Sequence, residues 1–228
     1  MDLDIQVSRL NLMKDNHTSQ QYRLEDNIRK NYPRQILTHT GRIQGYEKDI
    51  QKYTMEKQKS GENFSMKIGE RIFTEKKEAG DALTAFCRAV KLSNEMIPVG
   101  EYLGFSMEVL YESFTRTFYL NLKGSLTHKV EIGPDSMGNL TRISNKLNSM
   151  EKELLKEKQQ LAKVEKQLET AREEVEKPFE KEEELAEKLA RLSELNALLD
   201  MGEKQEESVL EKDNETEILP VRKGPMAI

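Results

Sequence analysis

Two interleaved ladders of residues, each with seven-residue spacing, run through residues 140–175. The first ladder is Leu140, Leu147, Leu154, Leu161, Leu168 and Val175, and the second is Ile143, Met150, Glu157, Val164 and Ala171. This spacing predicts a narrow apolar stripe along one side of a long helix, interrupted at Glu157. A helix cannot bury such a stripe alone, so it needs a second helix from the same chain or from a partner. The sequence therefore indicates a docking surface rather than a reaction centre.

A second heptad stripe follows Pro33 and supplies a candidate partner. Its members are spaced alternately three and four residues apart: Ile36, His39, Ile43, Tyr46, Ile50 and Tyr53. Gly41 and Gly45 weaken this helix by about 1 kcal/mol each relative to Ala, so it too needs a partner. We predict an antiparallel coiled coil with this seam: Ile36, Ile43 and Ile50 against Leu140, Leu147, Leu154, Leu161 and Leu168. We expect His39 to set the register. Glu157 is expected to pair with a basic residue on the facing helix, and the alternative is that it marks where the helix is exposed to water.

The segment between the stripes reads as a small α+β module. Residues 64–68 and 71–73 flank Gly69 and Glu70, which predicts a β-hairpin, and a helix is expected over residues 75–91. Pro98, Gly100 and Gly104 indicate a loop, and three strands are expected at 105–111, 115–122 and 126–132. His128 is interpreted as a cross-strand packing residue and Cys87 as a small core residue.

The predicted fold class is therefore α+β, with a long helical arm carrying a small module. We divide the chain into N-terminal helices and the first coiled-coil arm (1–59), the α+β module (60–137), the long heptad helix with the helix after it (138–201) and an acidic tail (202–228). Ser19 is the expected start of an N-terminal helix. Pro178 is expected to end the long helix, and Gly202 to cap the helix over residues 180–201. The tail has few large apolar residues and no period, so it is expected to be disordered.

The charge is unevenly distributed. The chain has a net charge of −5, but residues 21–59 carry nine Lys or Arg against five Asp or Glu, a net charge of +4. A cationic helix could neutralise phosphates, so Arg34, Arg42, Lys48 and Lys52 are the candidate nucleic-acid contacts, and weak DNA binding is expected there. The alternative is a solvated coiled-coil flank. A second candidate platform lies in the sheet region, although core packing is preferred for its aromatic members: Lys67, Arg71, Arg116, Lys123, Lys129, Phe105, Phe118 and Tyr119.

Signatures of catalysis are missing from the sequence. It contains neither a G-x-x-x-x-G-K-[S/T] loop nor the [N/D]-P-P-Y motif of amino-methyltransferases, and its three histidines are isolated from its one cysteine. We therefore expect no cofactor, no metal and no enzymatic activity. The lone cysteine fits a reducing compartment, and neither a signal peptide nor an apolar run of about 20 residues occurs, which predicts a cytoplasmic protein without membrane contact.

Several segments resemble one family in order and spacing across residues 1–201. They are MDLDIQVSRL (1–10), YRLED (22–26), GYEKDI (45–50), FTEKKEAG (73–80), GFSME (104–108), VEKPF (175–179), EEEL (182–185) and ARLSELN (190–196). They resemble the region after the helicase core in very large bacterial proteins of conjugative elements and phages. Those proteins join a DNA methylase module to a Swi/Snf-like superfamily 2 helicase. No helicase or methylase motif is present here, so the resemblance carries over no catalytic residue.

Two functions follow as expectations. The resemblance implies a non-catalytic C-terminal accessory region of a mobile-element DNA helicase/methylase, which contacts DNA or other domains of that machine. The alternative is a stand-alone interaction module that dimerises through the heptad stripe of residues 140–175. The expected partner is accordingly the helicase/methylase machinery or a second copy of the chain.

Overall fold

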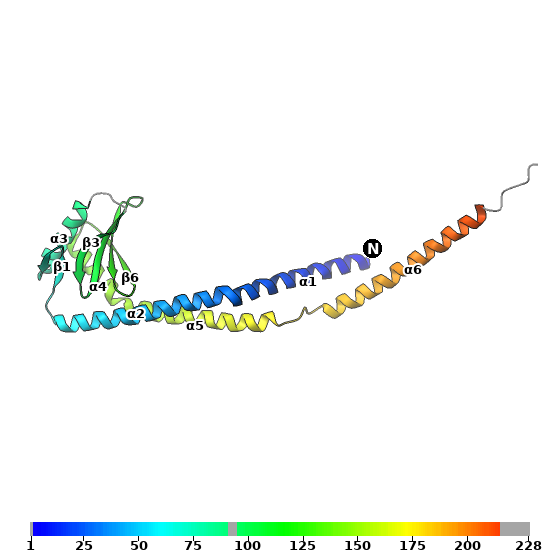
Figure 1. The fold of residues 1–228 in the computed structure, drawn as a ribbon, viewed down its shortest axis with the longest axis horizontal. Coiled ribbons are helices and arrows are strands. Elements are labelled where there is room, and N and C mark those ends of the chain that lie inside the picture. Colours follow the sequence, from blue (N-terminus) through cyan, green and yellow to red (C-terminus); the bar gives the residue numbers. More distant parts are fainter. Residues whose placement is uncertain (1, 91–94, 215–228) are drawn as a thin grey trace, which may run out of the picture. The chain divides into compact units, whose positions relative to one another are not determined.

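The computed structural model describes residues 2–90 and 95–214, with side chains described up to Leu199 and at Met201. It separates into two compact units, one made of Met1–Asp26 with Arg172–Ile228 and the other of Asn27–Ala171. The larger unit contains a six-stranded antiparallel sheet and the helices packed on it (Figure 1). The predicted α+β class is confirmed.

The sheet has the strand order β2-β1-β3-β4-β5-β6, with every neighbouring pair antiparallel. Its strands are β1 (Met66–Ile68), β2 (Arg71–Phe73), β3 (Ile97–Tyr102), β4 (Phe105–Glu112), β5 (Thr117–Lys123) and β6 (Thr127–Ile132). The hairpin at residues 64–73 and the last three strands were predicted. The loop predicted around Pro98 and Gly100 was wrong, because these residues lie in β3. A register shift between Pro98 and Gly100 accommodates them in the sheet.

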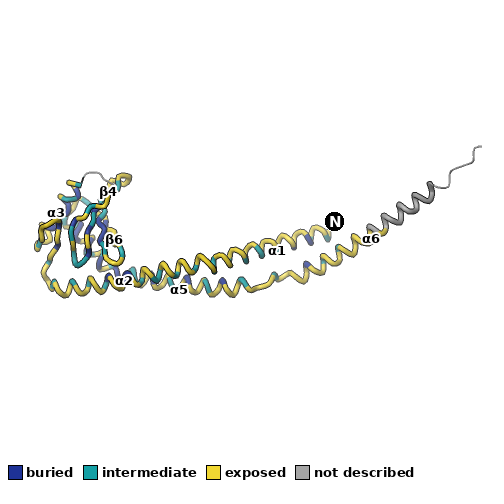
Figure 2. The backbone as a smooth tube through the Cα atoms, viewed as in Figure 1, coloured by how far each residue is buried: buried dark blue, intermediate teal, exposed yellow. Residues whose placement is uncertain are grey.

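One face of the sheet forms the core. Alternate residues of β4, β5 and β6 are buried on this face, including Phe105, Val109, Leu120 and Val130 (Figure 2). Helices α3 (Lys76–Ala89) and α4 (Ser136–Asn148) pack against each other, and their apolar residues join the same cluster. This cluster crosses the boundary predicted at residue 138.

The opposite face of the sheet carries mixed polar and charged side chains. Lys123 Nζ lies 2.6 Å from Glu108 Oε2, and Lys129 Nζ lies 3.6 Å from the centre of the Tyr119 ring. These residues alternate with the core positions along their strands, so they point away from α3 and α4. The sheet is thus a two-layer structure with one face packed on helices and one face polar.

Helix α2 (Tyr32–Ser60) follows a five-residue π-helix at Asn27–Asn31, labelled η1. Pro33 lies in the first turn of α2. Proline has no N–H to donate to the carbonyl four residues earlier, which explains why the helical hydrogen-bond pattern changes at this point. The Asn31 side chain donates to Asn27 Oδ1 at 2.6 Å within the widened turn.

The long heptad helix predicted from residue 138 is divided in two. Helix α4 ends at Asn148 and α5 runs over Met150–Val175, with a single turn residue, Ser149, between them. The Ser149 hydroxyl donates to the carbonyl of Lys146 at 2.8 Å, an alternative to the regular helical bonds. The first part of the heptad ladder therefore belongs to a helix that packs on the sheet, and only the second part lies in α5.

The smaller unit pairs two helices, α1 (Asp2–Asp26) and α6 (Glu182–Asn214). Their contacts run in opposite directions along the two helices: the Gln21 side chain donates to the carbonyl of Lys177 at 3.0 Å, Lys14 lies 2.6 Å from Glu182, and Lys188 donates to Gln6 at 2.8 Å. The apolar residues buried between the helices are Val7, Leu10 and Leu185. The pair is therefore antiparallel.

The ends of these two helices differ from the sequence-based predictions. Helix α1 begins at Asp2 rather than at Ser19, because the Val7 and Leu10 side chains give its first turns an apolar face to pack. Helix α6 passes through Gly202, so the predicted C-cap was wrong. A helical glycine costs only about 1 kcal/mol relative to Ala, and good helix formers follow it. Residues 202–214 of the tail predicted to be disordered lie in α6, so that part of the prediction was wrong, and residues 215–228 lie outside the described residues.

Candidate functional site

A buried carboxylate fixes α2 to the turn between β5 and β6. Asp49 accepts hydrogen bonds from the backbone N–H groups of Ser125 (2.6 Å) and Leu126 (2.9 Å), and its Oδ2 lies 2.9 Å from Nε2 of His128. Only 1% of Asp49 and 2% of His128 are exposed. A carboxylate accepts only, so Nε2 of His128 carries the proton in this contact.

The local sequence explains why the helix approaches the sheet so closely here. Gly45 lies one helical turn before Asp49 on the same side of α2, and a Cβ at Gly45 would lie 2.6 Å from side-chain atoms of Leu126. On the sheet side, His128 lies between the rings of Tyr46 and Phe105, with each ring centre 5.8 Å away. The expectation of simple cross-strand packing for His128 therefore missed its polar bond to Asp49.

This cluster holds the structure together and has no access for a substrate. All three donors converge on one carboxylate that is almost completely buried, so its hydrogen-bonding capacity is largely used. A buried ionisable pair often marks chemistry, but only where a cleft reaches it. We interpret Asp49 and His128 as the lock that orients α2 against the sheet.

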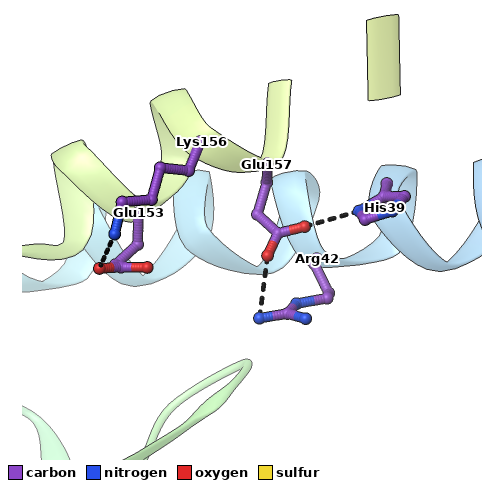
Figure 3. A network of polar contacts seen from close by, with 5 residues as sticks. All are labelled: His39, Arg42, Glu153, Lys156 and Glu157. Atoms are coloured by element: carbon purple, nitrogen blue, oxygen red, sulfur yellow. Dashed lines mark hydrogen bonds and ion pairs between the residues drawn. The ribbon is translucent and has the colours of Figure 1, made fainter. Parts of the chain in front are cut away.

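A second polar cluster joins α2 to α5 (Figure 3). Glu157 is 9% exposed; its Oε2 lies 2.7 Å from Nδ1 of His39, and its Oε1 lies 2.9 Å from the guanidinium of Arg42. Glu47 and Lys158, each about half exposed, form an ion pair at 2.8 Å beside this cluster. The predicted pairing of Glu157 with a basic residue on the facing helix is confirmed. His39, placed on the stripe by its spacing, is the second partner.

The seam residues do not all lie in the same environment. Leu140 and Leu147 are buried in the sheet core on α4, whereas the other members are only half-buried on α2 and α5: Ile36, Ile43, Ile50, Leu154, Leu161 and Leu168. The second ladder is the more buried one along α5, where Met150, Glu157, Val164 and Ala171 are covered. The interleaved ladder therefore occupies the more enclosed line of the helix.

The four candidate DNA contacts all lie on α2. Arg34 and Lys48 are exposed, Arg42 is half-exposed in its ion pair with Glu157, and the Lys52 ammonium lies 5.6 Å from the centre of the Phe105 ring. At 100° per residue these four positions span about a third of the helix circumference. The structure thus places them on a common side, with Arg42 and Lys52 also engaged in contacts within the unit.

The second basic group, in the sheet region, is dispersed. Phe105 is fully buried in the core, as preferred from the sequence, and Tyr119 lies under Lys129 on the open face. Arg71 lies 5.7 Å from the Phe73 ring at the β2 edge, and Arg116 lies in the turn between β4 and β5. These side chains do not form one platform.

Cys87 is confirmed as a core residue. It lies in the cluster between α3 and the sheet, and burial raises the pKa of its thiol from 9.0 to about 11. The thiolate, which is the reactive form, is therefore scarce near neutral pH.

Within the described part of the chain, no three His, Cys, Asp or Glu side chains gather as a set of metal ligands. Nor does any of its helices combine the length and apolar character needed to cross a bilayer.

Comparison of this chain with protein-family models, with curated proteins and with solved structures finds no match.

Proposed function

We propose that this chain is a non-catalytic accessory region of a mobile-element DNA helicase/methylase machine. In this proposal, α2 and α5 form an antiparallel coiled-coil arm that carries the α+β module, and the module and arm engage DNA or other domains of the machine. The placement in that machine rests on the sequence resemblance. The role as a carrier rests on the way α2 is attached at two points.

The observation that carries the proposal is the double attachment of α2 within one chain. Asp49 bonds it to the β5–β6 turn, and the Glu157 cluster bonds it to α5. Both attachments use side chains that the chain itself supplies, so the polar position in the α5 stripe already has its partners. This favours internal pairing over the alternative, in which residues 140–175 dimerise with a second copy.

The oligomeric state separates the two functions. Light scattering over a hundredfold range of protein concentration should give a constant mass near 26.4 kDa. A mass that rises to twice this value with concentration would support the dimerisation module. The same preparation should not hydrolyse ATP in the presence of DNA, and turnover that persists through repeated purification would overturn the non-catalytic assignment.

DNA contact by the arm is tested with a labelled duplex. Binding through a few phosphates should be weak and should fall with the logarithm of salt concentration, with a slope of about −0.9 per contact. Neutralising Arg34, Arg42, Lys48 and Lys52 together should remove it. Because Arg42 and Lys52 also have contacts within the unit, the double variant Arg34→Gln, Lys48→Gln is the structurally milder comparison. Unchanged affinity in both variants would leave the arm as a strut that acts through protein contacts.

A further inference from the structure

A cavity of about 340 Å³ lies at the end of the sheet where α3 finishes. Three segments line it: the second half of α3 with Thr84, Cys87 and Arg88, the end of the β4–β5 turn with Arg116 and the start of β5 with Phe118, and the end of β6 with Glu131. Its volume is at the lower end of the range for small-molecule sites and suits a group the size of one nucleotide. Neither the duplex-binding arm nor the Asp49 lock involves these residues.

Two arginines give this cavity its cationic character. Arg88 and Arg116 are both exposed, and among the described residues neither guanidinium has a hydrogen bond or an ion pair. Arginine presents several N–H donors in a planar fork that matches phosphate oxygens. Glu131 adds one acidic group on the β6 side, so a phosphate is expected on the side of the two arginines.

The backbone at Arg116 is unusual for an arginine. Its φ is +54°, in the left-handed region that glycine and asparagine occupy more readily. The turn is held by hydrogen bonds from the Thr115 hydroxyl to Glu112 (2.8 Å) and from the Thr117 hydroxyl to the carbonyl of Thr115 (3.1 Å). A left-handed non-glycine residue at a site with an unpaired charge is a reason to look for a function of its side chain.

The same turn carries a solvent-exposed aromatic side chain, Phe114. Phe114 is 97% exposed, the most exposed of the large hydrophobic residues in the described chain, and it lies two residues before Arg116. A flat apolar ring in water is stabilised by stacking on another flat group, and nucleobases stack on such rings with little sequence preference. Bases of a duplex are already stacked, so an unpaired strand is the form that can supply one.

We infer that the β4–β5 turn and the adjoining cavity bind single-stranded DNA, with one backbone phosphate at Arg88, a second at Arg116 and a base stacked on Phe114. This inference deepens the proposed function, because it names a DNA contact for the α+β module. An acidic peptide could satisfy the arginines, but it would leave the exposed phenyl ring without a flat partner. The combination of two free guanidinium groups and one exposed ring therefore favours the nucleic acid.

The test is fluorescence anisotropy of a fluorescein-labelled oligothymidylate titrated with the full chain at several salt concentrations. Two phosphate contacts on a single strand predict a slope of log affinity against log salt of about −1.4. Phe114→Ala should weaken binding by about 5- to 150-fold. Arg88→Gln and Arg116→Gly should each weaken it and each reduce the slope by about 0.7. Lys77→Gln, which removes an exposed cation from the first turn of α3, should change neither quantity.

Arg116→Gly distinguishes a binding role from a structural one. Glycine adopts the backbone conformation at this position without steric strain, so the melting temperature should stay the same or rise while binding falls. Absence of oligothymidylate binding, or variants that bind like the parent, would overturn the inference. Equal binding of a hexaglutamate peptide with the same dependence on both arginines would overturn it in favour of a protein ligand. The light-scattering experiment measures the oligomeric state and does not depend on DNA binding. The proposed function can therefore be refuted or supported independently of this inference.

Discussion

Replacing Asp49 by Asn removes the charge from the buried lock while keeping its shape. The carboxylate accepts from two backbone N–H groups and from His128 at 2.6–2.9 Å, and it is 1% exposed. An amide at this position turns an NH₂ group toward at least one of these donors. Hydrogen bonds to a charged group contribute about 1.5–3 kcal/mol each, and a buried donor left without its acceptor costs about 1–3 kcal/mol more.

We therefore expect Asp49→Asn to lower the free energy of unfolding by about 3–5 kcal/mol. For a unit of this size that corresponds to a fall in melting temperature of about 6–20 °C. Circular dichroism measures the thermal transition, and hydrogen exchange of peptides from β5 and β6 locates the loss, because exchange should accelerate around the β5–β6 turn.

Glu47→Gln is the matched control. It removes the same charge two residues earlier on the same helix, but from an ion pair that is half exposed, and such pairs contribute about 0–1 kcal/mol. If Asp49→Asn melts like Glu47→Gln, or if exchange in β5 and β6 is unchanged, the attachment of α2 to the sheet through Asp49 is refuted.

Three further changes test other parts of the structure. Glu157→Leu should leave stability unchanged or raise it by about 1 kcal/mol in urea unfolding, because leucine fits the heptad position and His39 and Arg42 keep access to water; a loss above 2 kcal/mol would contradict this. Ile43→Asp and Val164→Asp should each lower the melting temperature, because each places a charge in an apolar seam, and the effect should be larger at the more buried Val164. If both variants melt at the temperature of the parent chain, the stripes serve an external partner. The raised pKa of Cys87 means that the folded state holds the thiol proton more tightly than the unfolded state does. The resulting contribution to the free energy of unfolding is fully present below pH 9. About 3 kcal/mol of it is lost as the pH rises through about 11. Cys87→Ala should lack this component of the pH profile, and identical profiles would refute it.

The sequence predicted the parts of the fold that depend on local patterns. The hairpin around Gly69, helix α3 and strands β4 to β6 follow from alternation and turn residues, and the pairing of Glu157 follows from its place in an apolar ladder. Strand β3 was missed because Pro98 and Gly100 are read as loop residues. Its pairing with β1 and β4 is a long-range contact that overrides this local preference.

Long-range contacts also explain what was missed at the candidate sites. The bond between Asp49 and His128 joins residues 79 positions apart, and no local period marks it. The only signal in the sequence was Gly45 one helical turn before an acidic residue. The division of the heptad ladder at Ser149 was likewise hidden, because Leu140 and Leu147 fit equally well in a coiled coil and in a sheet core.

The contacts of the basic residues on α2 also depend on long-range packing. Basic residues on α2 were selected by charge alone, but the structure pairs Arg42 with Glu157 and brings Lys52 to Phe105. Charge patterns reveal which residues are cationic, whereas the partners come from the fold. The sequence named Arg116 and Phe118 in the second candidate platform but not Arg88, because the residues that line this cavity are separated along the chain and converge only when α3, β5 and β6 assemble.

The ion pair between Glu47 and Lys158 allows a direct measurement of whether α2 covers α5 within one chain. These side chains are 2.8 Å apart and half exposed, so a carbodiimide should join them with a zero-length amide bond. The reaction is run on a mixture of ¹⁴N- and ¹⁵N-labelled chains that have been unfolded and refolded together, and the crosslinked peptides are analysed by mass spectrometry. The internal arm predicts a Glu47–Lys158 crosslink in which both peptides carry the same isotope. Crosslinked pairs that combine one ¹⁴N and one ¹⁵N peptide would show that the stripe is covered by a second copy, and would contradict the account.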